Sequence, residues 1–319
     1  MPIRKTYKCS NNLRNPGNNQ ATTRQQKERK RQVLEKIGIV VEGGGMRGVF
    51  AAGVLDAFLE RGVKADYIIG VSAGACHASS YVSGQKGRSF RTNIDYIDDL
   101  RYLSLHNFLT TGSFFGMDFV FHEIPDQLDP YDYGAMMASP VEFEIGVTDL
   151  VTGRPAYFGK EDLYPGSSLL AASCALPVFS KPVEWKKRLY LDGGSSDPIP
   201  IRRALEKGCT RLLIVLTRER AYHKKPEGPR AAYQAAYRAY PETVRTLSLR
   251  HIVYRRAQSL AARLESEGKA LVLAPDAPVA VSRFTKDRQQ LTALYQSGYT
   301  KGLNAILPAW VNQEEEKSR

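Results

Sequence analysis

The sequence has few of the residues that build covalent or metal-held frameworks. Its 319 residues include five histidines and four cysteines, Cys9, Cys76, Cys174 and Cys209, which are scattered without a C-x-x-C pair. A disulfide framework or a zinc site needs closer and more regular spacing, and no stretch has the carboxylate spacing of a calcium loop. We therefore expect no metal site, and the isolated cysteines indicate a reducing, cytoplasmic compartment.

Long apolar runs are also missing. The longest candidate, residues 44–59, is interrupted by Arg47 and Asp56, and a membrane-spanning helix requires about 20 consecutive apolar residues. Hydrophobic residues nevertheless make up 43% of the chain, which is enough for a substantial core. The composition thus predicts a globular protein without a membrane-spanning helix.

Positive charge is in excess, but its distribution is uneven. The formal net charge is +12, and residues 1–36 contain ten Lys or Arg against two Glu. This segment is rich in Asn and Gln and poor in apolar residues, which is typical of a disordered tail, and it lacks the apolar segment of a secretory signal. A tether to an anionic membrane surface, at the inner face, stays open as a second interpretation. Because the rest of the chain is nearly balanced, we expect no nucleic-acid partner.

The folded part is expected to be one α/β domain over residues 37–312, with a charged tail at 313–319. Residues 37–41 and 67–71 have the continuous apolar pattern of buried strands, and helices are predicted at 49–61 and 73–82. Further strands are expected at 141–148, 189–191, 211–217 and 270–273, and further helices at 167–175, 200–207, 231–266 (interrupted at Pro241) and 286–307. Alternating strands and helices predict parallel strands with right-handed crossovers.

The most informative motif is Gly70-Val71-Ser72-Ala73-Gly74, which stands between an apolar strand and a helix of small residues. A G-x-S-x-G pentapeptide in this context is typical of a nucleophile elbow. The glycines tolerate the close backbone approach of so tight a turn. The serine then lies at a helix N-terminus, where backbone amides and the helix dipole favour a developing negative charge. Ser72 is therefore the candidate nucleophile.

A glycine-rich loop, Gly43-Gly44-Gly45-Met46-Arg47-Gly48, follows the first strand. A phosphate-binding P-loop is excluded, because Val49 and Phe50 follow where Lys and Ser or Thr are required. The spacing fits a dinucleotide fingerprint, but the acidic residue expected at the end of the second strand is missing. An oxyanion hole, with loop amides directed at the carbonyl that Ser72 attacks, is the favoured interpretation. A purely structural turn remains the alternative.

A third motif, Asp192-Gly193-Gly194, follows the short strand at 189–191. An aspartate released at a strand end can direct its carboxylate toward the serine and act as a general base. The alternative is a turn aspartate that accepts a hydrogen bond from its own backbone.

The three motifs, in this order and at these strand ends, resemble the patatin-like phospholipase family. The resemblance runs from about residue 39 to 201 and includes the flanks at 65–70, 171–177 and 197–200. The helical C-terminal part, about 220–310, is similar to that of bacterial patatin-like proteins of unknown substrate.

This resemblance implies a three-layer α/β/α fold with a mostly parallel central sheet. It also implies a serine hydrolase that cleaves carboxylic (acyl) esters of lipids, such as phospholipids or lysophospholipids, through an acyl-serine intermediate and without a cofactor. The family uses a Ser–Asp dyad, so Ser72 is the nucleophile and Asp192 the proton acceptor. The oxyanion loop would comprise Gly43, Gly44, Gly45, Met46, Arg47 and Gly48, and the remaining motif glycines are Gly70, Gly74, Gly193 and Gly194.

Other assignments remain open at this point. A conventional Ser–Asp–His triad would need His223 or His251, which both follow Asp192, although a surface or packing role is favoured for each. The aromatic residues between 106 and 121 would line an acyl pocket, form a cover or pack in the core. A nucleotide-binding protein, or a membrane-surface regulator without hydrolase activity, is the alternative function.

Overall fold

Sequence pattern and backbone agree in the first two strand–helix units. The computed structural model describes residues 35–163, 166–226, 230–308 and 311, so nearly all of the basic segment at 1–36 and the charged tail at 313–319 lie outside the described residues. Strands β1 (Ile37–Val41) and β2 (Tyr67–Val71) are almost completely buried. Each is followed by a helix, α2 (Val49–Glu60) and α3 (Ala73–Val82). Burial on both faces explains why these strands are continuously apolar.

The central sheet has the strand order β5-β6-β3-β2-β1-β7-β8, with β4 also paired to β3. Five strands run parallel: β1, β2, β3 (Glu142–Asp149), β7 (Arg211–Val215) and β8 (Ala270–Leu273). The mostly parallel sheet is therefore confirmed.

One edge of the sheet is antiparallel, which the expected strand–helix alternation did not include. Strands β4 (Pro155–Gly159) and β6 (Arg188–Asp192) run antiparallel to β3, and β5 (Val183–Trp185) runs antiparallel to β6. Because β5 and β6 are joined by only two residues, they form a hairpin rather than a crossover unit.

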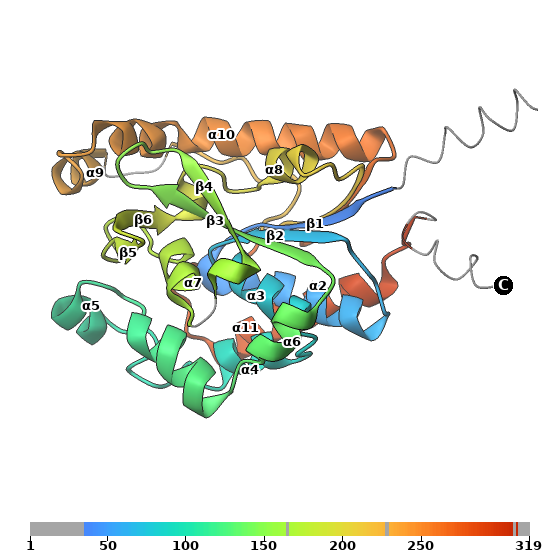
Figure 1. Cartoon of the computed structure of the whole chain (residues 1–319), viewed down its shortest axis with the longest axis horizontal. Coiled ribbons are helices and arrows are strands. Elements are labelled where there is room, and N and C mark those ends of the chain that lie inside the picture. Colours follow the sequence, from blue (N-terminus) through green and yellow to red (C-terminus); the bar gives the residue numbers. More distant parts are fainter. Residues whose placement is uncertain (1–34, 164–165, 227–229, 309–310, 312–319) are drawn as a thin grey trace, which may run out of the picture. The chain divides into compact units, whose positions relative to one another are not determined.

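Helices cover both faces of the sheet, which confirms the three-layer α/β/α fold. Figure 1 shows α8 (Ile201–Glu206), α9 (Arg230–Ala236) and α10 (Pro241–Ser266) on one side of the sheet. On the other side lie α2, α3, α7 (Ser168–Ser173) and α11 (Arg288–Asn304). Apolar side chains fill both interfaces, with Phe50 and Ile68 on the α2 side and Ile69 and Ile214 on the α10 side.

The predicted helix boundaries hold to within a few residues. The interruption at Pro241 is confirmed, since this proline is the first residue of α10, where its missing N–H is not needed. Residues 88–138 were not assigned from sequence. They form α4 (Arg88–Ile94), α5 (Leu105–Thr111), a π-helix at Phe119–Leu128 and α6 (Tyr133–Ala138).

Helices α2 and α11 pack backbone against backbone. A Cβ atom on Gly298 would collide with the carbonyl oxygen of Phe50, and one on Gly53 would collide with that of Tyr295. Glycine at both crossing points allows this approach. The helix that follows the glycine-rich loop is thus held in place by the last helix of the described chain.

Within the described ranges, no helix combines the length and the apolar character needed to cross a membrane.

Candidate active site

Ser72 stands at a strained turn between β2 and α3. Its backbone has φ 54° and ψ −136°, a conformation that residues with a Cβ rarely adopt, and its side chain is only 5% exposed. The two motif glycines pack against backbone. A Cβ on Gly74 would lie 2.6 Å from the carbonyl oxygen of Glu42, and one on Gly70 would lie 2.5 Å from the amide of Ala75. The turn has the geometry expected of a nucleophile elbow, with the backbone strain at Ser72.

A neighbouring serine, Ser173, holds this turn in place. The Ser72 amide donates to Ser173 Oγ at 2.8 Å, and Ser173 Oγ donates to the Gly146 carbonyl at 2.7 Å. Helix α7 thereby links the elbow to β3 through a fully buried hydroxyl. The sequence analysis quoted this residue only within the 171–177 flank. The available signal was a hydroxyl that follows four apolar residues in this helix.

Asp192 reaches the elbow from the antiparallel strand β6. It pairs in register with Val147 of β3, and the preceding residue, Gly146, pairs with Val71 of β2. Strand β6 therefore enters from beyond the carboxyl ends of the parallel strands and stops at the level of Ser72. Asp192 lies at the expected edge of the sheet, although its strand runs in the opposite direction to the parallel strands.

The two oxygens of Asp192 have different partners. Ser72 Oγ donates to Oδ2 at 2.7 Å, and the Gly194 amide donates to Oδ1 at 2.7 Å. One oxygen therefore accepts the turn hydrogen bond of the Asp-Gly-Gly motif, and the other faces the serine as the general-base prediction requires.

Burial sets the basicity of this carboxylate. Asp192 is 1% exposed, and loss of solvation raises its pKa above the ordinary aspartate value, against the opposing effects of Arg250, the Ser72 hydroxyl, Arg283 and the Gly194 amide. A carboxylate with a raised pKa is a better proton acceptor than one in water. Burial and the 2.7 Å contact therefore favour proton transfer from Ser72 Oγ to this carboxylate.

No histidine in the described part of the chain is hydrogen-bonded to Ser72 or Asp192. His223 lies at the surface, with its Nε2 3.1 Å from Arg255 Nη1, and His251 is a half-buried residue of α10. Burial lowers the pKa of His77 to about 4, and its Nε2 has no hydrogen-bond partner. Among the described residues, the acceptor of the Ser72 hydroxyl is thus the Asp192 carboxylate rather than an imidazole.

The amides of the glycine-rich loop differ in whether they already donate a hydrogen bond within the protein. The Met46 amide donates to the Arg283 carbonyl and the Arg47 amide to that of Gly44, both at 3.3 Å. The amides of Gly44 and Gly45 donate to no acceptor in the described ranges. Gly43 packs against the elbow, since a Cβ there would lie 2.8 Å from Ser72 Cβ.

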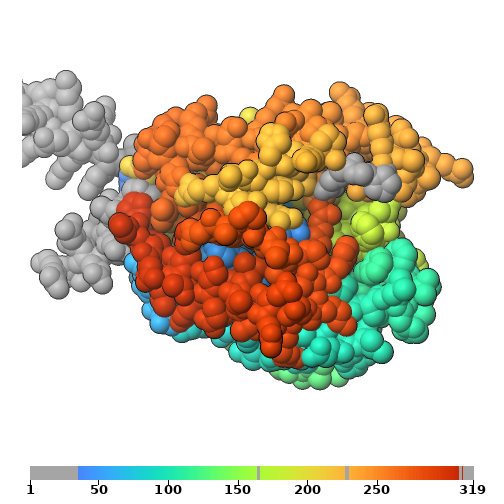
Figure 2. All heavy atoms as spheres, turned by 180° about the vertical axis from the view of Figure 1, so that it is seen from behind, coloured from blue at the N-terminus to red at the C-terminus, as the bar shows by residue number. Residues whose placement is uncertain are grey.

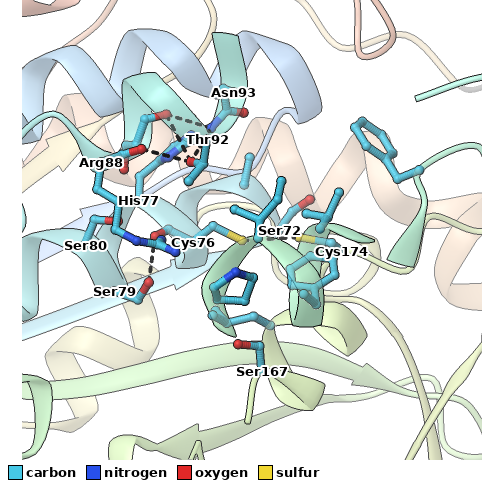
Figure 3. A pocket seen from close by; sticks show the side chains of 18 of the residues that line it. Ser72, Cys76, His77, Ser79, Ser80, Arg88, Thr92, Asn93, Ser167 and Cys174 are labelled. Atoms are coloured by element: carbon cyan, nitrogen blue, oxygen red, sulfur yellow. Dashed lines mark hydrogen bonds between the residues drawn. The ribbon is translucent and has the colours of Figure 1, made fainter. Parts of the chain in front are cut away.

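An apolar cavity opens on one side of Ser72. Figure 3 shows Ser72, Cys76, His77 and Cys174 around it. Its apolar lining includes Met46, Tyr102, Phe115, Val120, Phe121, Ile124, Leu170 and Leu176. Two of the aromatic residues predicted between 106 and 121 therefore reach the cavity, whereas Phe108 stacks on Phe114 at 4.4 Å between ring centroids.

Two thiols lie in the wall of this apolar cavity. Cys76 Sγ and Cys174 Sγ are 3.6 Å apart and both residues are free. The hydrogen bond to Cys76, together with burial, raises the pKa of Cys174, so this thiol stays protonated and uncharged.

A second, cationic cavity opens on the other side of Ser72. Its lining contains Ser72, Asp192, Glu42 and five basic residues: Arg47, Arg218, Lys224, Arg250 and Arg283. Figure 2, the view from behind, shows the C-terminal elements, orange to red, forming much of the visible face, with blue atoms from the start of the described chain between them. This cavity is not recognisable from the sequence, because its basic residues come from distant segments.

In the described ranges, no group of three or more His, Cys, Asp or Glu residues is arranged to hold a metal ion.

Two family models match the chain. The patatin-like phospholipase model matches residues 39–205, and a model called domain of unknown function (DUF6363) matches residues 240–310. The first match confirms the resemblance inferred from the three motifs.

Curated relatives extend these matches. The uncharacterized protein YjjU of Escherichia coli is 28% identical over 57% of this chain and 52% of its own length. An uncharacterized NTE family protein of Mycobacterium tuberculosis is 25% identical over 52% of this chain and 44% of its own length. The matches thus span about half the length of these relatives. The uncharacterized protein YqhO of Bacillus subtilis is 24% identical over 81% of this chain and 94% of its own length.

Among solved structures, the chain is similar to VipD from Legionella pneumophila, with a TM-score of 0.42 and 14% identity over 84% of this chain and 66% of that one.

Proposed function

Because the chain belongs to the patatin-like phospholipase family, we propose that it is a lipid acyl hydrolase with a Ser72–Asp192 dyad. The observation that carries the proposal is the 2.7 Å hydrogen bond from Ser72 Oγ to Asp192 Oδ2 at a strained elbow. A serine that donates directly to a buried carboxylate has its proton acceptor already in place.

The reaction begins when Asp192 Oδ2 accepts the proton of Ser72 Oγ, which attacks the acyl carbonyl carbon. The carbonyl oxygen becomes an oxyanion, for which the amides of Gly44 and Gly45 and the N-terminal end of α3 supply donors. As the tetrahedral intermediate collapses, protonated Asp192 gives its proton to the departing alcohol oxygen. An acyl-serine remains.

The second half of the reaction, hydrolysis of the acyl-serine, repeats the same proton transfers with water in place of Ser72. Asp192 removes a proton from a water molecule, which attacks the acyl-serine carbonyl, and then returns that proton to Ser72 Oγ as the free acid leaves. The raised pKa of Asp192 supports proton transfer in both directions, because the carboxyl group must accept a proton and release it within one catalytic cycle. No step needs a metal or an organic cofactor.

The apolar cavity beside Ser72 suits the acyl chain of the substrate. We propose carboxylic esters of lipids, such as phospholipids or lysophospholipids, as substrates, hydrolysed in the cytoplasm. We also propose that residues 37–312 form the hydrolase domain. The basic segment at 1–36 would provide peripheral contact with an anionic membrane surface.

The direct test removes the nucleophile. Ser72→Ala is expected to lower the turnover of an acyl ester by on the order of 10⁴ to 10⁶-fold and to abolish labelling by an acyl-serine probe. Ser266→Ala is the matched control, because that hydroxyl is at the surface and bonds only to the Arg263 carbonyl of its own helix. A folded Ser72→Ala protein that keeps a tenth of the activity would refute the assignment, and a wild-type protein that binds lipid vesicles without ester hydrolysis would favour the regulatory alternative.

A further inference from the structure

The apolar and the cationic cavity meet at the nucleophile. Gly45, Ser72 and Leu176 line both of them. An ester whose carbonyl lies at Ser72 therefore has one end directed into the mainly apolar cavity, where Arg88 is paired with Asp129. Its other end is directed into a group of positive charges. The two ends of the substrate are expected to differ in the same way.

Three of the five basic residues of the second cavity, Arg47, Lys224 and Arg250, are buried, and Arg218 and Arg283 are half-buried. Arg47 is 8% exposed and Lys224 is 7% exposed, and the buried Nε of Arg47 has no hydrogen-bond partner. Burial together with the repulsion of Arg218 and Arg283 lowers the pKa of Arg47 to about 10. Gathering like charges out of water costs free energy, and a bound anion would offset that cost.

The acidic residues of the cavity have other partners. Glu42 accepts hydrogen bonds from the Thr217 amide at 2.7 Å and from the Tyr254 hydroxyl at 2.8 Å, and burial raises its pKa. Asp192 is bonded to Ser72 and Gly194. Both carboxyl groups are therefore hydrogen-bonded within the protein, and five basic residues line the same cavity.

We propose that the cationic cavity binds the phosphate group of the substrate, so that the preferred substrate is a phosphate-bearing acyl ester. The proposal rests on the hydrolase function above. Guanidinium groups pair with phosphate oxygens through two parallel hydrogen bonds, and four of the five basic residues are arginines. In a glycerol phospholipid only a few bonds separate the ester from the phosphate. When the carbonyl lies at Ser72, the phosphate reaches the adjacent cavity and the acyl chain the apolar one.

Most of this phosphate site comes from outside the patatin match. Arg218 follows β7, Arg250 lies on α10 with its Nε donating to the Gly194 carbonyl at 2.6 Å, and Arg283 lies between β8 and α11. All three positions come after residue 205, where the patatin model ends. Head-group selection is thus assigned to the C-terminal part of this chain.

The test compares two esters with the same short acyl chain, 1-octanoylglycerol 3-phosphate and 1-octanoylglycerol, below their aggregation limits. For the wild type, kcat/KM is expected to be at least tenfold higher for the phosphate ester. Arg218→Gln is the chosen variant, because Arg250 and Arg283 also stabilise the charged form of Asp192. It should lower that preference by about ten- to a hundredfold, as expected for the loss of a charge-assisted hydrogen bond, and Arg218→Lys should restore part of it.

The control is Arg245→Gln, an exposed arginine on the same helix as Arg250, and its substrate preference should match the wild type. Glycerol 3-phosphate should inhibit competitively, and glycerol should not. Equal kcat/KM for the two esters would overturn this inference while leaving the hydrolase function intact. Inhibition by inorganic phosphate without any preference for the phosphate ester would also overturn it, in favour of a free-anion site. Hydrolysis of neither ester would count against the proposed function itself.

Discussion

Replacing Asp192 with asparagine separates a dyad from a triad. The substitution keeps the shape of the side chain, and the asparagine Oδ1 can still accept from the Gly194 amide, which lies 2.7 Å from the corresponding aspartate oxygen. The asparagine Nδ2 would then face Ser72 Oγ, where the carboxylate oxygen now lies at 2.7 Å. An amide N–H is a donor, so the hydroxyl loses its acceptor and its proton turns away.

The expected loss follows from the role of the lost group. If Asp192 is the base, the variant retains the oxyanion donors and the binding cavities but no proton acceptor. Removal of the base from a coupled catalytic unit costs on the order of 10⁴ to 10⁶-fold in turnover. This corresponds to about 5 to 8 kcal/mol of transition-state stabilisation.

The same substitution should not weaken the fold at neutral pH. The pKa of Asp192 is raised in the folded protein, so the folded state holds this proton more tightly than the unfolded state. Above the folded pKa the buried charge therefore lowers stability, and this cost disappears as the pH falls below the unfolded value. Asparagine carries no charge at any pH, so Asp192→Asn should unfold at the wild-type temperature or above it.

The assay measures initial rates on a soluble acyl ester, with folding checked by circular dichroism and thermal unfolding. Asp197→Asn is the matched control, because its carboxyl group is close by in sequence but accepts from the Tyr157 hydroxyl at 2.6 Å. That control and His223→Ala should keep most of the activity. An active Asp192→Asn beside an inactive His223→Ala or His251→Ala would refute the dyad.

Two further predictions concern pH and packing. The acidic limb of the kcat/KM profile should have its midpoint above the ordinary aspartate pKa of about 4, because Asp192 must be deprotonated and burial raises its pKa; a limb centred below that value would contradict the assignment of the base. Gly298→Ala should destabilise the protein by about 1 to 3 kcal/mol or more in urea unfolding, since the new methyl group meets the Phe50 carbonyl, whereas Gly134→Ala, which meets only the end of the Asp132 side chain, should stay within about 1 kcal/mol of the wild type.

Features carried by neighbouring residues were predictable from sequence. The elbow motif consists of five consecutive residues, and the two strands that precede it are unbroken apolar runs. For this reason β1, β2, α2 and α3 were predicted within a residue of their bounds. The position of Asp192 at the same edge as Ser72 was also anticipated, but the direction of its strand was not. Strand β6 has five residues and a two-residue link to β5, and so short a sequence pattern does not determine whether the strand runs parallel or antiparallel.

Features that depend on distant segments were not predictable. The contact of Ser173 with the Ser72 amide joins residues that are 101 positions apart. The cationic cavity combines residues from position 42 to position 283, and no local pattern distinguishes these arginines from solvated ones. Residues 119–128 form a π-helix that contains Pro125. The helix and strand periodicities used to read the sequence do not predict a π-helix.

The packing of α2 against α11 has a consequence for the order of events during synthesis. The glycine-rich loop and α2 lie near the start of the folded chain, yet they close against residues 288–304, and β1 needs β7 as its neighbour in the sheet. When only the elbow motif has emerged from the ribosome, β7 and α11 are not yet available to pack against β1 and α2. The nascent chain therefore lacks the surroundings that hold the elbow in its strained conformation. If the proposed function holds, hydrolase activity should appear only after ribosome-bound chains have extruded α11.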